Sequence, residues 1–110
     1  MLPRAYRLPA SRFASVKSQG QLIQTSLFGC LILASHEPNS RLGFIVSTKL
    51  SSKATVRNHI RRLLREAVRA LLPRLSPGHD FLILAKHPLL NANLKVITQA
   101  FHEILTPYFN

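Results

Sequence analysis

The chain has 110 residues, of which 15 are Lys or Arg and 4 are Asp or Glu, so its formal charge is +11. Hydrophobic residues make up 46%, which is normal for a folded chain, and the length suits one compact domain over residues 1–110. The four acids are scattered along the sequence, which argues against a nuclease site built from clustered carboxylates. Such an excess of positive charge is typical of domains that bind a polyanion.

The single cysteine, Cys30, excludes an internal disulfide and a CxxC zinc site, and it fits a reducing compartment. None of the five histidines has metal-ligand spacing with another His or with Cys30, so we expect no metal site. The longest apolar run, residues 27–34, is too short for a transmembrane helix. The prolines and arginines of residues 1–10 do not fit a signal peptide. We therefore expect a cytoplasmic protein.

The N-terminal region predicts an arm followed by a short helix. Residues 1–10 combine prolines and arginines and are expected to form a flexible basic arm. A helix is predicted over residues 11–19, with Ser11 as its N-terminal cap. Gly20 is expected to end this helix.

The rest of the chain alternates between extended and helical patterns. Residues 22–35 read as extended, and residues 41–47 as a further strand rich in β-branched and aromatic side chains. A helix is predicted over residues 54–72, a strand over 81–85 and a final amphipathic helix over 93–105. The order is a helix, two or three antiparallel strands, a helix, a strand and a helix, which with three strands is α-β-β-β-α-β-α. It predicts an α+β fold, in which helices pack on one mostly antiparallel sheet.

The helix over residues 54–72 carries two stripes when its residues are spaced at about 100° each. The stripe expected to be buried comprises Val56, Ile60, Leu63, Leu64, Ala67, Val68 and Leu71. The cationic face beside it comprises Arg57, Asn58, Arg61, Arg62, Arg65 and Arg69. Glu66 lies at the rim of this face and is the only acid in the helix.

A solvated surface is the simplest interpretation of the cationic face, but it would require acids to pair with the arginines. The helix has one acid for five arginines. Each pair of like charges one turn apart lowers the stability of the helix by about a few tenths of a kcal/mol. Binding of a polyanion is therefore the better interpretation. The planar guanidinium group grips phosphate in a bidentate way. Strands flank this helix, which argues against a DNA-binding helix-turn-helix and favours RNA.

The segment Lys53–Glu66 (KATVRNHIRRLLRE) resembles the signature of the bacterial ribonuclease P protein subunit, a basic residue and a short apolar stretch followed by R-N-R-x-(K/R)-R-x-x-R-E. Arg41–Lys49 resembles the family's strand that leads into a Ser/Lys-rich loop. Phe13–Gly20 and Asp80–Lys86 resemble its first helix and a later strand, so the resemblance covers nearly the whole chain. His59 departs from the pattern, because it replaces the second arginine of R-N-R and removes one permanent charge.

The resemblance implies a protein cofactor of an RNA enzyme that hydrolyses one phosphodiester to remove the 5′ leader from precursor tRNA. Magnesium would be held mainly by the RNA subunit, and the protein would supply no catalytic residue. The partners implied are ribonuclease P RNA and precursor tRNA with its leader, and no membrane. The family fold also has a left-handed β-α-β crossover around the signature helix, although a right-handed one is the general preference.

The cationic face and the resemblance predict an RNA-binding set of residues, and the resemblance alone implies a leader-binding cleft. The RNA-binding set comprises Lys49, Lys53, Arg57, Asn58, Arg61, Arg62, Arg65 and Arg69. The leader-binding cleft would be lined by Phe13, Lys17 and Leu31, with Arg61 reaching it from the helix. A ribosomal or other RNA-scaffold protein without tRNA-processing activity is the main alternative, and a stand-alone nuclease that uses a histidine is a second.

Overall fold

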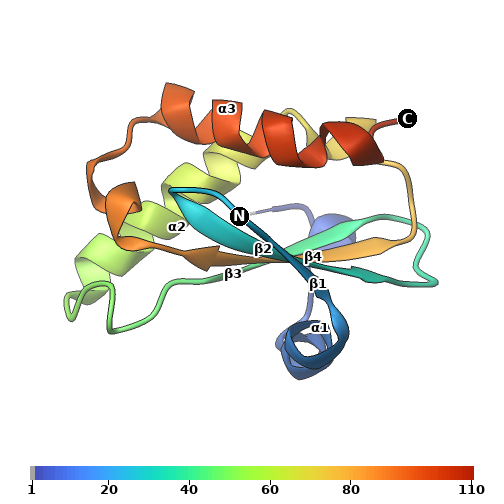
Figure 1. Cartoon of the computed structure of the whole chain (residues 1–110), viewed down its shortest axis with the longest axis horizontal. Coiled ribbons are helices and arrows are strands. Elements are labelled where there is room, and N and C mark those ends of the chain that lie inside the picture. The colour runs from blue at the N-terminus through green and yellow to red at the C-terminus, as the bar shows by residue number, and fades with distance from the viewer. Residues whose placement is uncertain (1) are drawn as a thin grey trace.

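The computed structural model describes residues 2–110 and contains a four-stranded sheet with α1 on one face and α2 and α3 on the other (Figure 1). The strand order is β1-β2-β4-β3, antiparallel except for the parallel pair of β3 and β4. This arrangement confirms the predicted α+β fold and its element order. The elements are α1 Phe13–Gln19, β1 Gln21–Gln24, β2 Phe28–Ala34, β3 Arg41–Ile45, α2 Ala54–Arg69, β4 His79–Ala85 and α3 Leu94–Leu105.

The parallel strands β3 and β4 are neighbours in the sheet, and α2 connects them. In Figure 1 both strands run from right to left, α2 lies above the sheet, and β4 lies closer to the viewer than β3. A crossover with this geometry is left-handed, which differs from the usual preference for a right-handed connection. The resemblance to the ribonuclease P protein subunit implied this hand, and the structure has it.

The segment that was predicted as one extended run, residues 22–35, is a hairpin of two strands. Thr25 makes the turn, because its Oγ1 accepts hydrogen bonds from the backbone N–H of Leu27 at 3.2 Å and of Phe28 at 3.0 Å. The N–H of Thr25 in turn donates to the carbonyl of Phe28 at 2.9 Å. The turn contains neither Gly nor Pro, so the sequence lacks the usual signal for it.

The sheet buries apolar side chains on both faces. On one face, the rings of Phe28 in β2 and Phe101 in α3 stack with centroids 4.7 Å apart. On the other, Val16 of α1 packs with Leu31 and Leu82. Cys30 is buried as expected, and its burial raises the pKa of the thiol to about 12.

The N-terminal arm packs along the outer edge of β3. Leu2 and Leu8 are buried, and the N–H of Leu8 donates to the carbonyl of Leu42 at 2.9 Å. Arg7 pairs with Leu42 as an isolated parallel bridge. Two apolar side chains of the described part of this segment are therefore buried, and the flexible arm predicted for residues 1–10 stays a prediction.

Two details of the predicted helices need correction. Ser11 does not cap α1, since a 3₁₀ turn over Ala10–Arg12 precedes that helix and no side chain caps it. The amphipathic pattern of α3 predicts Leu94 on its buried side, but this side chain is 40% exposed. Gly20 ends α1 as predicted, and its N–H donates to the carbonyl of Val16 at 2.8 Å.

Candidate nucleic-acid interface

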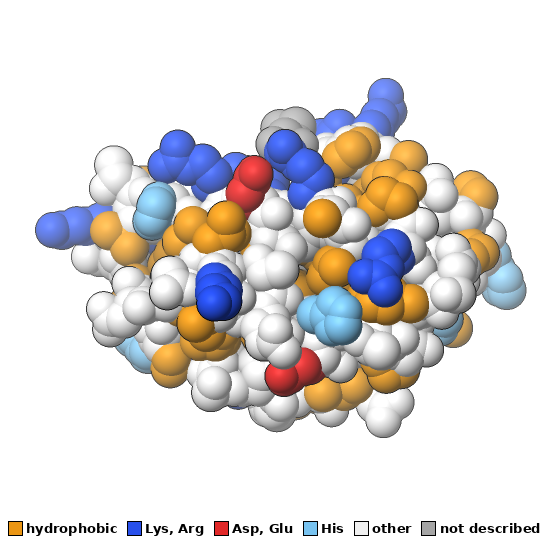
Figure 2. All heavy atoms as spheres, turned by 90° about the horizontal axis from the view of Figure 1, so that it is seen from above, with side chains coloured by type: hydrophobic (Ala, Val, Ile, Leu, Met, Phe, Trp, Pro, Cys, Tyr) orange, Lys and Arg blue, Asp and Glu red, His pale blue; other side chains and the backbone are white. Residues whose placement is uncertain are grey.

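The packing of α2 determines where its arginines lie. Ile60, Leu64 and Val68 recur at helical spacing and are buried in the core. Because these side chains occupy the inner side of the helix, the cationic residues of α2 occupy its outer side. Figure 2 shows Lys and Arg side chains gathered along one margin of the molecule, whereas the rest of that face has isolated charges.

The members of the cationic face differ in their exposure and contacts. Nη1 of Arg57 donates to the carbonyl of Ser51 at 2.9 Å, which ties the start of α2 to the preceding loop. Nη1 of Arg61 donates to Oδ1 of Asn58 at 3.0 Å. Arg57, Arg61 and Arg65 are half-buried, and Asn58, Arg62 and Arg69 are exposed. These contacts hold the guanidinium groups in place without neutralising them.

Carboxylates do little to offset the charge of this face. The single ion pair within α2 joins Nη1 of Arg69 to Oε2 of Glu66 at 3.8 Å, and both side chains are about half exposed. An exposed pair of this kind contributes at most about 1 kcal/mol. Across residues 2–110, no carboxylate forms an ion pair with the other four arginines of the face, Arg57, Arg61, Arg62 and Arg65.

A shallow depression of about 490 Å³ lies on the cationic face and is lined by Thr55, Asn58, His59, Arg62 and Arg65. The hydroxyl, amide and imidazole groups supply hydrogen bonds beside two guanidinium groups. An RNA backbone presents phosphate oxygens and ribose hydroxyls, which are the partners that this combination suits.

The loop before α2 extends the positive charge beyond the helix. Lys49 and Lys53 are both exposed. Lys49 also lines a second depression, of about 250 Å³, with Ser47, Lys86 and His87. Lys86 was not predicted as a binding residue, and its Nζ donates to the carbonyl of Thr25 at 2.8 Å. Lys86 is far from the arginine-rich helix in the chain, so the sequence gives no indication that it lies near Lys49.

The three residues predicted for the leader-binding cleft lie on the α1 side of the sheet. Phe13 and Leu31 belong to the same apolar cluster, in which Leu31 is 7% exposed and Phe13 is half-buried. Lys17 lies one turn after Phe13 on α1 and is exposed. Phe13 is therefore the aromatic ring that remains partly accessible beside this cluster.

The ring of Phe13 forms one wall of an apolar pocket of about 200 Å³ beside Gly43 of β3. A Cβ atom at Gly43 would lie 2.7 Å from Cε1 of Phe13, so only glycine permits this close approach. Arg65 of α2 also lines the pocket. Of the residues predicted for the leader-binding cleft, Phe13 lines this pocket, whereas Lys17, Leu31 and Arg61 do not. Arg65 thus contributes both to this pocket and to the depression on the cationic face.

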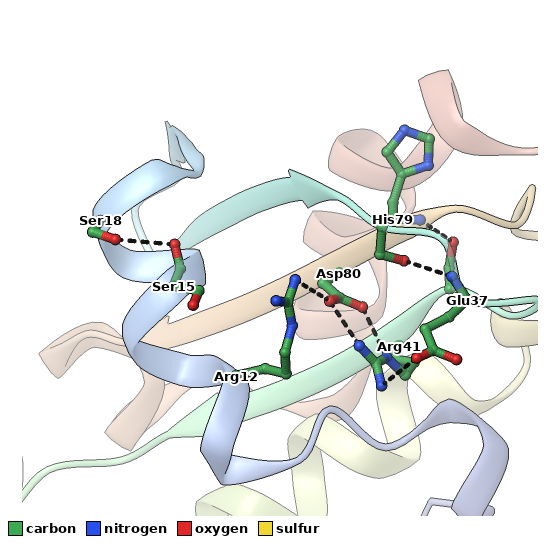
Figure 3. Close-up of polar contacts among 9 residues, drawn as sticks. Arg12, Ser15, Ser18, Glu37, Arg41, His79 and Asp80 are labelled. Atoms are coloured by element: carbon green, nitrogen blue, oxygen red, sulfur yellow. Dashed lines mark hydrogen bonds and ion pairs between the residues drawn. The ribbon is translucent and has the colours of Figure 1, made fainter.

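A buried ion-pair network centred on Asp80 was not predicted from the sequence (Figure 3). The Asp80 carboxylate is fully buried and accepts hydrogen bonds from Nε and Nη2 of Arg41, both at 2.9 Å. Nη2 of Arg12 approaches the same carboxylate at 3.3 Å, and Glu37 lies 3.5 Å from Nη1 of Arg41. The hydrogen bond with Asp80 raises the pKa of the Arg41 guanidinium.

The donor set of this chain does not fit a metal site. Within residues 2–110, no three His, Cys, Asp or Glu side chains come together in a way that could hold a metal ion. Asp80 is occupied by two arginines, and Glu66 pairs with Arg69. We therefore derive no chemical step from a metal bound by this chain alone. No helix in the described part of the chain has the length and hydropathy needed to span a membrane.

Comparisons with known proteins agree with the geometry. Residues 2–108 match the family model described as Ribonuclease P. The chain is 38% identical over 90 residues to the ribonuclease P protein component of Roseiflexus castenholzii, covering 81% of this chain and 73% of that protein. It is 34% identical over 87 residues to the same component of Picosynechococcus sp., covering 78% of this chain and 75% of that protein.

Solved structures have the same fold. The RNase P protein of Staphylococcus aureus superimposes with a TM-score of 0.82 at 25% identity, over 97% of this chain and all of that one. The RNase P protein of Thermotoga maritima gives a TM-score of 0.82 at 25% identity, over 94% of this chain and 98% of its own.

The Asp80 network is expected to stabilise the fold. Asp80→Asn should lower the free energy of unfolding by about 3–5 kcal/mol, because two arginines lose a buried counter-charge. Urea denaturation followed by circular dichroism measures this change. Glu103→Gln is the matched control, since Glu103 is exposed, and its effect should stay within about 0.5 kcal/mol. Similar values for the two variants would contradict the stabilising role of Asp80.

Proposed function

The chain belongs to the bacterial ribonuclease P protein family, and on that premise we propose that it binds the catalytic RNA of ribonuclease P through α2 and the 5′ leader of precursor tRNA beside α1. The protein would thereby assist hydrolytic removal of the leader. The observation that carries the proposal is the outer face of α2, where four arginines have no carboxylate partner among the described residues.

The charge of α2 supports RNA as the partner of this face. Neighbouring guanidinium groups one turn apart repel one another, and this repulsion is relieved when phosphates come between them. Lys49 and Lys53 enlarge the positive surface at the start of the helix. Contacts of this kind position an RNA through its backbone and require no particular base sequence. A folded RNA with closely spaced phosphates is the partner that fits.

The chemistry of bond cleavage is assigned to the RNA subunit in this proposal. Magnesium would be held mainly by that RNA and would supply the hydrolytic chemistry there. The protein's own residues contribute by binding and orienting the two RNA molecules. The cytoplasm is the proposed location, which agrees with the lone buried thiol of Cys30.

The pocket beside Phe13 supports a role in leader binding. A partly accessible aromatic ring offers a stacking surface for an unpaired base, and Arg65 at the same pocket offers a cation for the adjoining phosphate. Lys17 lies one turn further along α1 and is exposed. A single strand crossing this region would meet one ring and two cations.

Reconstitution tests the proposed function directly. The protein is added to a bacterial ribonuclease P RNA at low magnesium concentration, and leader removal from precursor tRNA is measured. We expect the protein to stimulate cleavage by the RNA and to cleave nothing alone. RNA binding without stimulation would favour the alternative of an RNA-scaffold protein, and cleavage without the RNA subunit would favour a stand-alone nuclease.

Removing two arginines of the cationic face should weaken binding to ribonuclease P RNA and reduce its salt dependence. In the Arg61→Ala/Arg65→Ala variant, the slope of log Kd against log salt should fall by roughly 1.4–1.8, because each phosphate contact contributes about 0.7–0.9. Filter binding over a salt series measures the slope. The Arg74→Ala/Lys95→Ala variant loses the same charge elsewhere and should keep the wild-type slope; an equal fall in both variants would rule out a specific docking face.

Phe13→Ala should weaken binding of leader-bearing precursor tRNA to the holoenzyme and leave mature tRNA unaffected. The expected loss is about 5-fold to 150-fold in Kd, since stacking of one base on an aromatic ring contributes about 1–3 kcal/mol. Phe13→Leu keeps an apolar side chain without the ring and should show most of the same loss. Equal weakening for both RNAs would indicate that Phe13 serves the protein core alone.

A further inference from the structure

Helix α1 is too short to set its own position. It has seven residues, and no side chain caps its N-terminus. Isolated helices of this length are unstable in water, so tertiary contacts must fix the helix on the sheet. Val16 supplies one such contact, because it is fully buried under the helix. That contact lies in the middle of α1, whereas Phe13 at the start of the helix is only half-buried in the same apolar cluster.

Arg12 supplies a second contact at the start of α1. Its Nη2 approaches Oδ2 of Asp80 in β4 at 3.3 Å, and Asp80 is fully buried. Figure 3 shows Arg12 extending from the beginning of the α1 ribbon to the Asp80 carboxylate, which Arg41 of β3 meets from another direction. The pair thus joins α1 to both parallel strands, β3 and β4, next to the residue that carries the aromatic ring.

The surroundings make this pair more than a loose surface contact. Arg41 holds both oxygens of Asp80 through two hydrogen bonds of 2.9 Å, so the carboxylate has a fixed orientation. The Arg12 side chain is 37% exposed, and its Nε is buried without a hydrogen-bond partner among the described residues.

We propose that Arg12 is a positioning residue of the leader-binding cleft. By pairing with Asp80, it fixes the start of α1 so that the ring of Phe13 lies against Gly43 and walls the pocket shared with Arg65. The approach to Gly43 has little tolerance, since even a Cβ there would lie 2.7 Å from the ring. A shift of α1 would therefore change the stacking surface. This inference rests on the proposed role of the cleft in leader binding.

A direct contact between Arg12 and RNA is the competing explanation, and salt dependence separates the two. A guanidinium group that touches a phosphate contributes about 0.7–0.9 to the slope of log Kd against log salt. A positioning residue contributes nothing to that slope, because its charge is already paired with Asp80. A direct contact outside the leader path would also affect leader-bearing and mature tRNA equally.

The experiment uses holoenzyme reconstituted with wild-type protein, Arg12→Gln, Arg12→Lys or the charge-matched control Arg74→Gln. The Kd values for leader-bearing precursor and mature tRNA are measured over a salt series. We expect Arg12→Gln to reduce the preference for the precursor by about fivefold, the scale of a partly exposed ion pair, with an unchanged slope. Arg12→Lys should restore part of the preference, and Arg74→Gln should match the wild type. Thermal melts confirm that each variant is folded.

Three results would overturn the proposal. The first is an Arg12→Gln holoenzyme that prefers leader-bearing precursor over mature tRNA as strongly as the wild type does. The second is a reduced salt slope for either tRNA, which would make Arg12 a direct phosphate contact. The third is a wild-type holoenzyme that does not prefer the precursor, which would remove the leader role of the cleft as well. If Arg12→Gln does not fold, Arg12→Lys tests the proposal instead. A preference for the precursor equal to that of the wild type in Arg12→Lys would show that the guanidinium group is not needed, and this would overturn the proposal.

Discussion

The arginines of α2 lie close together on one side of the helix, and the fold must supply the free energy that keeps these like charges there. The arginines of α2 repel one another, and the ion pair between Glu66 and Arg69 offsets little of that repulsion. Burial of Ile60, Leu64 and Val68 on the opposite side supplies the compensating free energy, because each such side chain contributes about 1.5–3 kcal/mol when fully buried. The core thus maintains a charged surface that is complementary to RNA phosphates before any RNA is present.

Two surfaces that could serve different RNA molecules meet at Arg65. This residue lines the depression on the outer face of α2 and also the pocket beside Phe13. The left-handed crossover explains the proximity, since it brings α2 back over β3, the edge strand along which the N-terminal arm and Phe13 also pack. A catalytic RNA on α2 and a leader beside α1 would therefore lie next to each other, which suits a protein that aligns a substrate with an RNA enzyme.

The features that follow from local patterns could be predicted from the sequence. The apolar spacing of α2 predicted both its buried side and its cationic side, because a helix repeats every 3.6 residues. The hairpin turn escaped prediction, since the hydroxyl of Thr25 makes it without Gly or Pro. The role of Asp80 depends on Arg12 and Arg41, which lie 68 and 39 residues away in the chain, and no local pattern reports such pairing. The RNA-contacting residues of α2 remain predictions.

Directed cleavage of the RNA tests most directly whether the outer face of α2 meets the catalytic RNA. Cys30 is buried and is the only cysteine, so an Fe–EDTA group can be attached selectively to Asn58→Cys or to Gln99→Cys on α3. Both replaced residues are exposed amides on helices. The account predicts localised hydroxyl-radical cuts in ribonuclease P RNA from position 58 and none from position 99. Cuts from position 99 alone, or from neither, would contradict it.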